Sequence, residues 1–95
     1  NLPATISIGS AYPNPFNHEL RLPISIIEPG SVTYAIYDLK GRIMSSGERR
    51  FESNGMDSFS WNGMGPDGLY SPSGTYFIKI NSGEIVQTQK ILYLK

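Results

Sequence analysis

The chain has 95 residues, with eight basic and eight acidic side chains, no cysteine, ten glycines and seven prolines. A chain of this length suits one domain with a core of its own, and its balanced charge excludes an electrostatic footprint for nucleic acid or an anionic membrane. The lack of cysteine excludes disulfide frameworks, zinc–thiolate sites and cysteine nucleophiles. No apolar run has the length of a transmembrane helix, so we expect no transmembrane segment. The balanced charge leads us to expect no nucleic-acid partner.

The first elements are a short strand over residues 4–8 and the segment AYPNPFN, residues 11–17. Proline fixes φ and removes a backbone donor, which excludes a helix or a central strand at 11–17. This segment is predicted to be a stiff, extended hinge, either a recognition element or a kink between sheets. Tyr12 and Phe16 are expected to pin it to the sandwich edge.

Apolar side chains then alternate with polar ones over residues 19–26, which predicts a half-buried strand. Pro23 within it predicts an edge strand or a bulge. A second alternating segment, 32–37, ends at the turn DLKG. There Asp38 can bond its own backbone and Gly41 favours positive φ.

The rest of the chain shows further alternating or polar segments separated by turn residues, at 42–52, 57–61, 75–80 and 84–95. Asn54-Gly55 is a hairpin signal, and Trp61 is the expected central core residue. No stretch shows helical periodicity. The pattern predicts an all-β, immunoglobulin-like or fibronectin III-like antiparallel sandwich of about seven strands.

An enzyme is not expected from these residues. His18 is the single histidine, no serine stands in a nucleophile elbow, and no carboxylate is fixed beside the imidazole. The acidic residues are scattered singly along the chain, so a paired-carboxylate site has no support in the spacing. His18 is interpreted as an exposed residue at the start of a strand.

The loop NGMGPDG, residues 62–68, offers the oxygens of Asn62 and Asp67 to calcium, but it lacks the acidic pattern of a dedicated calcium loop. The structural interpretation is a long turn in which both side chains bond the local backbone. Tyr70 and Phe77 are the candidates for exposed stacking on a sugar, but packing in the core or at its rim is the favoured interpretation. No metal and no cofactor are expected.

Several motifs together resemble a known family. They run in one order over almost the whole chain: YPNPFN (12–17), YAIYDLKGRIMSSG (34–47), WNGMGPDGLYSPSGTYFIKI (61–80) and QKILYLK (89–95). The chain resembles the C-terminal sorting domain, type A, of proteins exported by the bacterial type IX secretion system, also called the Por secretion system. It is also similar to the immunoglobulin-like domain of the flagellar hook-cap assembly protein.

The resemblance implies a non-catalytic module that carries an attached cargo across the outer membrane to the cell surface or the medium. Its implied partners are the type IX machinery, a sortase-like peptidase and an upstream cargo domain in the same chain. The residues carried over as recognition elements are Pro13, Asn14, Pro15, Asp38, Gly41, Arg42, and the stretch from Lys90 to Lys95. His18-Glu19 departs from the family pattern, which often has a proline and a small hydroxyl residue there.

The domain boundaries follow from the same resemblance. Residues 1–11 are expected to be a linker or first strand leading from the cargo, and residues 12–95 the sorting domain. The chain starts at Asn1 rather than Met, which suggests a piece of a longer protein. The alternative function is an accessory immunoglobulin-like spacer, or a carbohydrate-binding sandwich, of a secreted hydrolase.

Overall fold

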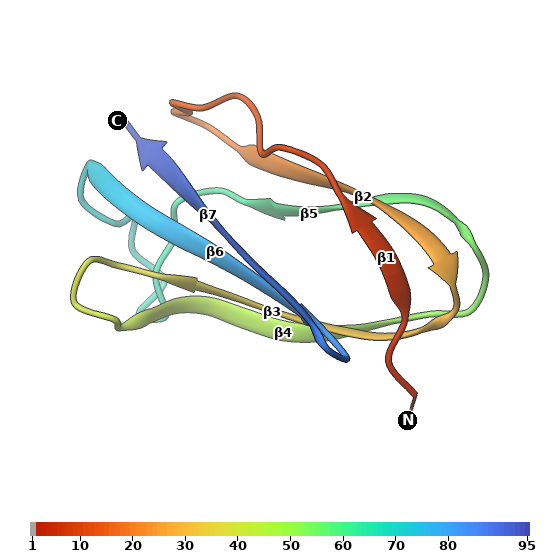
Figure 1. Ribbon diagram of the computed structural model, residues 1–95. Coiled ribbons are helices and arrows are strands. Elements are labelled where there is room, and N and C mark those ends of the chain that lie inside the picture. Colours follow the sequence, from red (N-terminus) through yellow and green to blue (C-terminus); the bar gives the residue numbers. More distant parts are fainter. Residues whose placement is uncertain (1) are drawn as a thin grey trace.

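The computed structural model describes residues 2–95, which form seven strands in two antiparallel sheets (Figure 1). The strands are β1 (Thr5–Ile8), β2 (Leu20–Glu28), β3 (Gly30–Tyr37), β4 (Ile43–Phe51), β5 (Gly55–Trp61), β6 (Gly74–Ser82) and β7 (Ile85–Tyr93). One sheet has the order β1-β2-β5 and the other the order β4-β3-β6-β7. The predicted all-β sandwich is confirmed. Nowhere in residues 2–95 is there a helix long and apolar enough to span a membrane.

The core forms between the facing sides of the two sheets, because alternate side chains of a strand point to one face. In β2 the inward row is Leu20, Leu22, Ile24 and Ile26, all of them buried. The other sheet contributes buried aliphatic side chains from its central strands and from β7, namely Val32, Ile36, Ile78, Ile80 and Ile91. Trp61 is only 4% exposed, so its predicted place in the core is confirmed.

Pro23 does not mark an edge strand or a bulge, and that prediction is wrong. β2 is the central strand of its sheet, and Pro23 pairs in register with Ser58 of β5. Its carbonyl accepts a hydrogen bond from the Gly9 N–H at 2.9 Å, one residue after β1 ends at Ile8. The missing N–H of the proline therefore falls where β1 no longer needs a donor, which is why a central strand tolerates it.

Asn54-Gly55 does not close a hairpin either. β4 pairs with β3 in one sheet and β5 pairs with β2 in the other. Residues 52–54 therefore carry the chain from sheet to sheet. Alternation identifies a strand but not its partner, so a turn signal between two strands does not establish that the two strands pair. The hairpins with short turns are β3–β4 and β6–β7, and the latter turns at Gly83-Glu84.

The connections divide between the two ends of the sandwich. One end, here called the loop end, carries residues 9–19, the turn 38–42, the loop 62–73 and residues 94–95 (Figure 1). The other end carries the short connections β2–β3, β4–β5 and β6–β7. Antiparallel topology thus gathers the predicted recognition segments at one end of the molecule.

Candidate recognition surface

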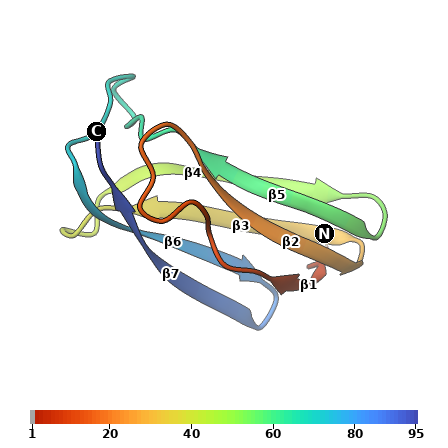
Figure 2. The same ribbon diagram turned by 90° about the horizontal axis from the view of Figure 1, so that it is seen from above.

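The hinge segment, residues 11–17, lies with the two residues before it along the outer edge of β7 near its end (Figure 2). The Phe16 N–H donates to the Leu92 carbonyl and the Leu94 N–H donates to the Phe16 carbonyl, both at 2.9 Å. These are the bonds of a short parallel bridge to Tyr93. β7 is the edge strand of its sheet, so the hinge segment covers an edge that would otherwise expose unpaired backbone groups.

Side-chain amides extend this cover. Asn14 donates from Nδ2 to the Lys90 carbonyl at 3.1 Å, and its Oδ1 accepts from the Leu92 N–H at 2.9 Å. Gln89 works in the opposite direction: its Oε1 accepts from the Ala11 N–H at 2.8 Å and its Nε2 donates to the Gly9 carbonyl at 2.6 Å. An amide has both a donor and an acceptor, so one side chain can replace a strand residue in pairing.

The hinge segment is bent rather than extended, so that part of the prediction is wrong. The backbone bends at residues 13–15, and the segment contacts β7 at Asn14 and again at Phe16. The Tyr12–Pro13 and Asn14–Pro15 peptide bonds are cis. The two prolines are exposed, where their missing N–H groups leave nothing unpaired.

The two aromatic residues that flank the prolines behave differently. Phe16 is 2% exposed and stacks on Tyr93 with ring centroids 4.9 Å apart and an interplanar angle of 25°. Tyr12 is 53% exposed and is held by backbone bonds to Arg21, each 2.8 Å long. Phe16 therefore pins the hinge with its ring, as predicted, whereas the ring of Tyr12 does not.

Removing the Asn14 side chain tests the edge cover. We expect Asn14→Ala to lower the free energy of unfolding by about 1–3 kcal/mol, because it deletes two hydrogen bonds and leaves the Leu92 N–H unpaired. Denaturant unfolding and amide exchange at Leu92 measure this. Asn17→Ala, at an exposed asparagine of the same segment, is the control. Equal losses for both variants would contradict the assignment.

The turn 38–42 is built around the carboxylate of Asp38. Its Oδ1 accepts from the N–H groups of Lys40 and Arg42, both at 2.9 Å, and its Oδ2 accepts from the Arg42 Nε at 2.7 Å. Gly41 has φ +83°, a left-handed conformation that favours glycine, and donates its N–H to the Asp38 carbonyl. Asp38 and Gly41 thus shape the turn, while the Arg42 side chain is 72% exposed.

The Asp38 carboxyl is expected to titrate below the ordinary aspartate value. Desolvation acts to raise its pKa, but hydrogen bonds from Arg42 and Lys40 outweigh it and lower the pKa from 3.8. Because the folded pKa lies below the unfolded one, the turn's stabilisation is present above the unfolded pKa and is lost as pH falls through the folded pKa. Carbon NMR titration of the carboxyl measures this, and Arg42→Leu should move the pKa back upward. An unchanged pKa in that variant would refute the mechanism.

The loop 62–73 has the local hydrogen bonds that its interpretation as a long turn predicts. Asn62 Oδ1 accepts from the Met64 N–H and Asp67 Oδ1 from the Leu69 N–H, both at 3.0 Å. Each is an amide two residues further on, as in an Asx turn. Across residues 2–95 no group of three or more histidine, aspartate or glutamate side chains could hold a metal ion. Calcium binding at Asn62 and Asp67 stays a prediction, and no cluster of acidic or histidine side chains in residues 2–95 supports it.

A pocket of about 410 Å³ opens at the loop end between residues 17–18, the 62–73 loop and the chain end. It is lined by Asn17, His18, Tyr70, Tyr93 and Lys95. His18 is exposed, as predicted, and Tyr70 is 57% exposed, whereas packing in the core or at its rim was favoured for it. No carboxylate lines this pocket, so the imidazole has no acid beside it there. The Lys95 N–H donates to Ser73 Oγ at 2.9 Å, which ties the chain end to the 62–73 loop.

The structure brings some of the predicted recognition residues into direct contact. Asn14 bonds the Lys90 backbone, whereas Asp38, Gly41 and Arg42 form a separate turn at the same end. Gln89 was missed. A signal exists in the sequence, since Gln89 is a polar residue in the same alternating row as Ile91 and Tyr93, but its partners lie 78 and 80 residues away.

The family model described as a secretion system C-terminal sorting domain matches residues 10–94. No curated protein matches the chain.

The fold is similar to parts of larger solved proteins. Dimeric latent PorU from Porphyromonas gingivalis has TM-score 0.71 and 20% identity over 99% of this chain, which spans 10% of that chain. PorZ of the same organism, a surface component of its type IX secretion system, has TM-score 0.65 and 20% identity over 94%, spanning 12%. FlgD from Xanthomonas campestris, a hook-capping protein of flagellar assembly, has TM-score 0.62 and 16% identity over 95%, spanning 66%. This chain therefore covers a small part of the first two proteins.

Proposed function

Because this chain belongs to the secretion system C-terminal sorting domain family, we propose that it directs an attached protein through a bacterial type IX secretion system. The family match over residues 10–94 is the observation that carries the proposal. The fold likeness to PorZ, itself a surface component of that system, agrees with it. The destination is the cell surface or the medium, reached through the periplasm and the outer membrane.

The domain acts by being recognised and catalyses no step. Its partners are the type IX machinery, a sortase-like peptidase and the cargo domain upstream in the same chain. Five of the predicted recognition residues have exposed side chains that are available to a partner: Pro13, Pro15, Arg42, Lys90 and Lys95. Within residues 2–95 the one side-chain bond among them is the Arg42–Asp38 pair. These five are the ones that a partner contacts, while Asn14 and Asp38 hold the segments that present them.

Deleting residues 12–95 from the full-length secreted protein tests the proposal. We expect the truncated protein to accumulate in the periplasm, because the sorting signal is gone. The matched control replaces residues 12–95 with an unrelated β-sandwich of similar size, which preserves bulk but not the recognised surface, and it should also fail to reach the outside. Normal export of either protein would overturn the proposal.

Carbohydrate binding is the second candidate, and one observation favours it. The exposed Tyr70 ring lies in the pocket with Asn17, His18 and Lys95, so that a stacking surface and polar groups converge. A glycan array separates the two functions. Glycan binding that Tyr70→Ala removes would support the accessory function, and an array without binding would leave sorting as the single proposed function.

A further inference from the structure

The two lateral sides of the sandwich are closed to different degrees. One side is formed by the edge strands β1 and β7, and the hinge segment covers the β7 edge from Lys90 to Leu94. The other side is formed by the edge strands β4 and β5, which belong to different sheets. Near the β4–β5 connection this second side is sealed, and toward the loop end it is open.

Arg49 seals the closed half. Its Nη1 donates to the Ser58 carbonyl at 2.8 Å and its Nη2 to Asp57 Oδ2 at 2.9 Å. The guanidinium carbon also lies 5.1 Å and 5.3 Å from the ring centres of Phe51 and Phe59, a cation–π arrangement that fixes the side chain between the sheets. Ser58 also donates its N–H to Asp57 Oδ1 at 2.7 Å, so both outward backbone groups of β5 at Ser58 are satisfied.

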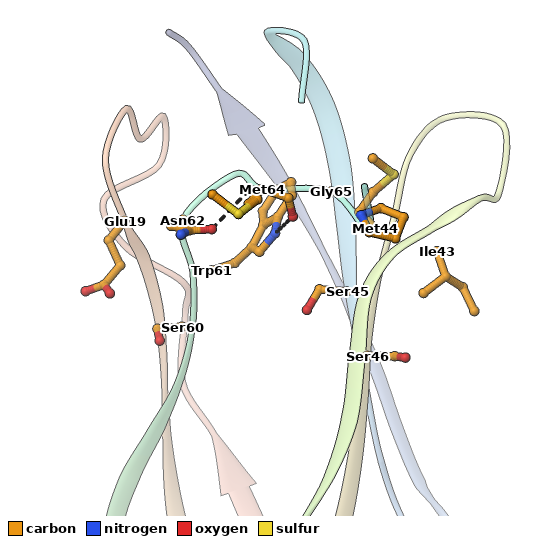
Figure 3. Close-up of a pocket in the computed structure, with 11 residues that line it drawn as sticks. Glu19, Ile43, Met44, Ser45, Ser46, Ser60, Trp61, Asn62, Met64 and Gly65 are labelled. Carbon is orange, nitrogen blue, oxygen red and sulfur yellow. Dashed lines mark hydrogen bonds between the residues drawn. The ribbon is translucent and has the colours of Figure 1, made fainter. Parts of the chain in front are cut away.

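The open half is a cleft of about 580 Å³ between the β4 and β5 edges (Figure 3). Small polar residues form its rims, with Ser45 and Ser46 on one side and Ser60 on the other. Its apolar lining comes from Trp61 and from the side chains Ile43, Met44, Met64 and Pro66. Methionine side chains are adaptable and suit a surface that accepts more than one apolar group.

The strand register shows which backbone groups of β4 face this side. The Asn14 bonds show that Lys90 and Leu92 of β7 direct their backbone groups outward, and such groups alternate along an antiparallel strand. When this alternation is followed pair by pair from β7 through β6 to β3, the backbone N–H and C=O of Ala35 face β6. Its partner on β4 is Ser46, whose backbone N–H and C=O therefore point away from β3. β4 is the last strand of its sheet, so the N–H and C=O of Ser46 have no strand partner.

The same reasoning applies to β5. Ser58 directs its carbonyl outward to Arg49, so Ser60, two residues further along the strand, also directs its backbone groups outward. β5 too is the last strand of its sheet. Unpaired backbone donors and acceptors therefore stand on the rims at both Ser46 and Ser60.

Charge separates the open half from the sealed one. Residues 43–47 of β4 carry no charge, while residues 48–52 are Glu-Arg-Arg-Phe-Glu. Charged side chains are the usual protection of an edge strand against pairing, and here they protect only the half that Arg49 already closes. In the open half, β4 has the small, uncharged residues Ser45, Ser46 and Gly47, which let another backbone approach. The one charged side chain among the lining residues is Glu19, just before β2.

We propose that the open half of the β4 edge binds an extended segment of a partner polypeptide, which pairs with the backbone of Ser46 and places an apolar side chain in the cleft. A strand is the occupant because the rims offer alternating N–H and C=O groups, and pockets beside a free edge select alternate side chains. The inference rests on the proposed function, since the partner belongs to the export machinery. It assigns the pairing to the β4 edge, because the hinge segment already covers the end of the β7 edge.

Two substitutions in adjacent residues test the proposal. Ser45 points into the cleft and Ser46 points to the other side of β4 (Figure 3), so Ser45→Phe fills the cleft and Ser46→Phe does not. Peptides selected from a phage library of random dodecapeptides serve as probes, with the Kd measured by fluorescence anisotropy. We expect Ser45→Phe to weaken binding about tenfold or more and Ser46→Phe less than about twofold. A library without binders, or equal effects of both variants, overturns the proposal.

A second pair of variants keeps the test decisive if Ser45→Phe fails to fold. Ser46→Pro removes an outward N–H without breaking the β3–β4 ladder, and Thr88→Pro does the same on the exposed part of the β7 edge. Only Ser46→Pro should weaken peptide binding, and amide exchange at Ser46 should slow when peptide is added to the unaltered chain. Stronger loss with Thr88→Pro places the binding edge on β7 and overturns the proposal.

Export separates this inference from the proposed function. If deletion of residues 12–95 blocks export while Ser45→Phe leaves both export and peptide binding unchanged, the inference falls and the sorting function stands. If the deletion leaves export normal, the sorting function falls, and tight peptide binding at the β4 edge remains a property of the domain.

Discussion

Replacing Trp61 with alanine is expected to lower the free energy of unfolding by about 3–5 kcal/mol, a large share of the total for a small domain. The indole is buried against Tyr76, with ring centroids 5.1 Å apart, and against Phe16 at 5.8 Å. Its Nε1 donates to the Met64 carbonyl at 2.9 Å, so the ring also anchors the start of the 62–73 loop. Denaturant unfolding followed by circular dichroism measures the loss.

Two variants separate the contributions of Trp61. Trp61→Phe keeps an aromatic ring but removes the N–H, and should cost less than Trp61→Ala while loosening the loop at Met64. Tyr70→Ala, at an exposed aromatic residue of that loop, should change the free energy by less than about 0.5 kcal/mol. A Tyr70→Ala loss as large as that of Trp61→Ala would show that Trp61 does not organise this end of the core.

Phe16→Ala is expected to cost about 3–5 kcal/mol as well, although Phe16 lies in an irregular segment. The ring is stacked on Tyr93, and the backbone of the same residue pairs with Leu92 and Leu94. Losing the ring therefore removes both apolar contact and the anchor that keeps the hinge segment on β7. Unfolding and amide exchange at Leu94 measure the two consequences.

The control for Phe16 is its counterpart across the two prolines. Tyr12→Ala removes an exposed ring whose backbone bonds to Arg21 remain, so we expect less than about 0.5 kcal/mol. Phe16 and Trp61 are in contact, so the double variant should show a coupling energy of about 0.5 kcal/mol or more. Simple additivity of the two losses would mean that the aromatic cluster does not act as a unit.

The sequence predicts the strands well and their neighbours poorly. Period-two alternation identifies β2 because its inward row, from Leu20 to Ile26, is buried residue by residue. The edge or bulge prediction from Pro23 is wrong because the strand that would need the Pro23 N–H ends at Ile8. The end of that pairing is set by the tertiary structure and not by the local sequence. The hairpin prediction from Asn54-Gly55 is wrong for the same reason, since the strands that flank it belong to different sheets.

The candidate surface follows the same division. Local bonding is predictable, and Asp38, Asn62 and Asp67 bond the backbone two residues on, as their residue types indicate. The partner of Asn14 is not predictable, because Leu92 lies 78 residues further along the chain. The same holds for the Arg49 bonds to Asp57 and Ser58, which depend on two edge strands of different sheets lying side by side.

The solubility of the domain depends on the attachment of the hinge segment to β7. Detaching residues 11–16, by a protease cut or by tension on the upstream chain, would bare the backbone of Lys90 and Leu92 together with the flat face of Tyr93. An unpaired strand edge beside an exposed aromatic surface favours association with other molecules in water. A processed domain of this design would therefore self-associate unless another molecule took the vacated place.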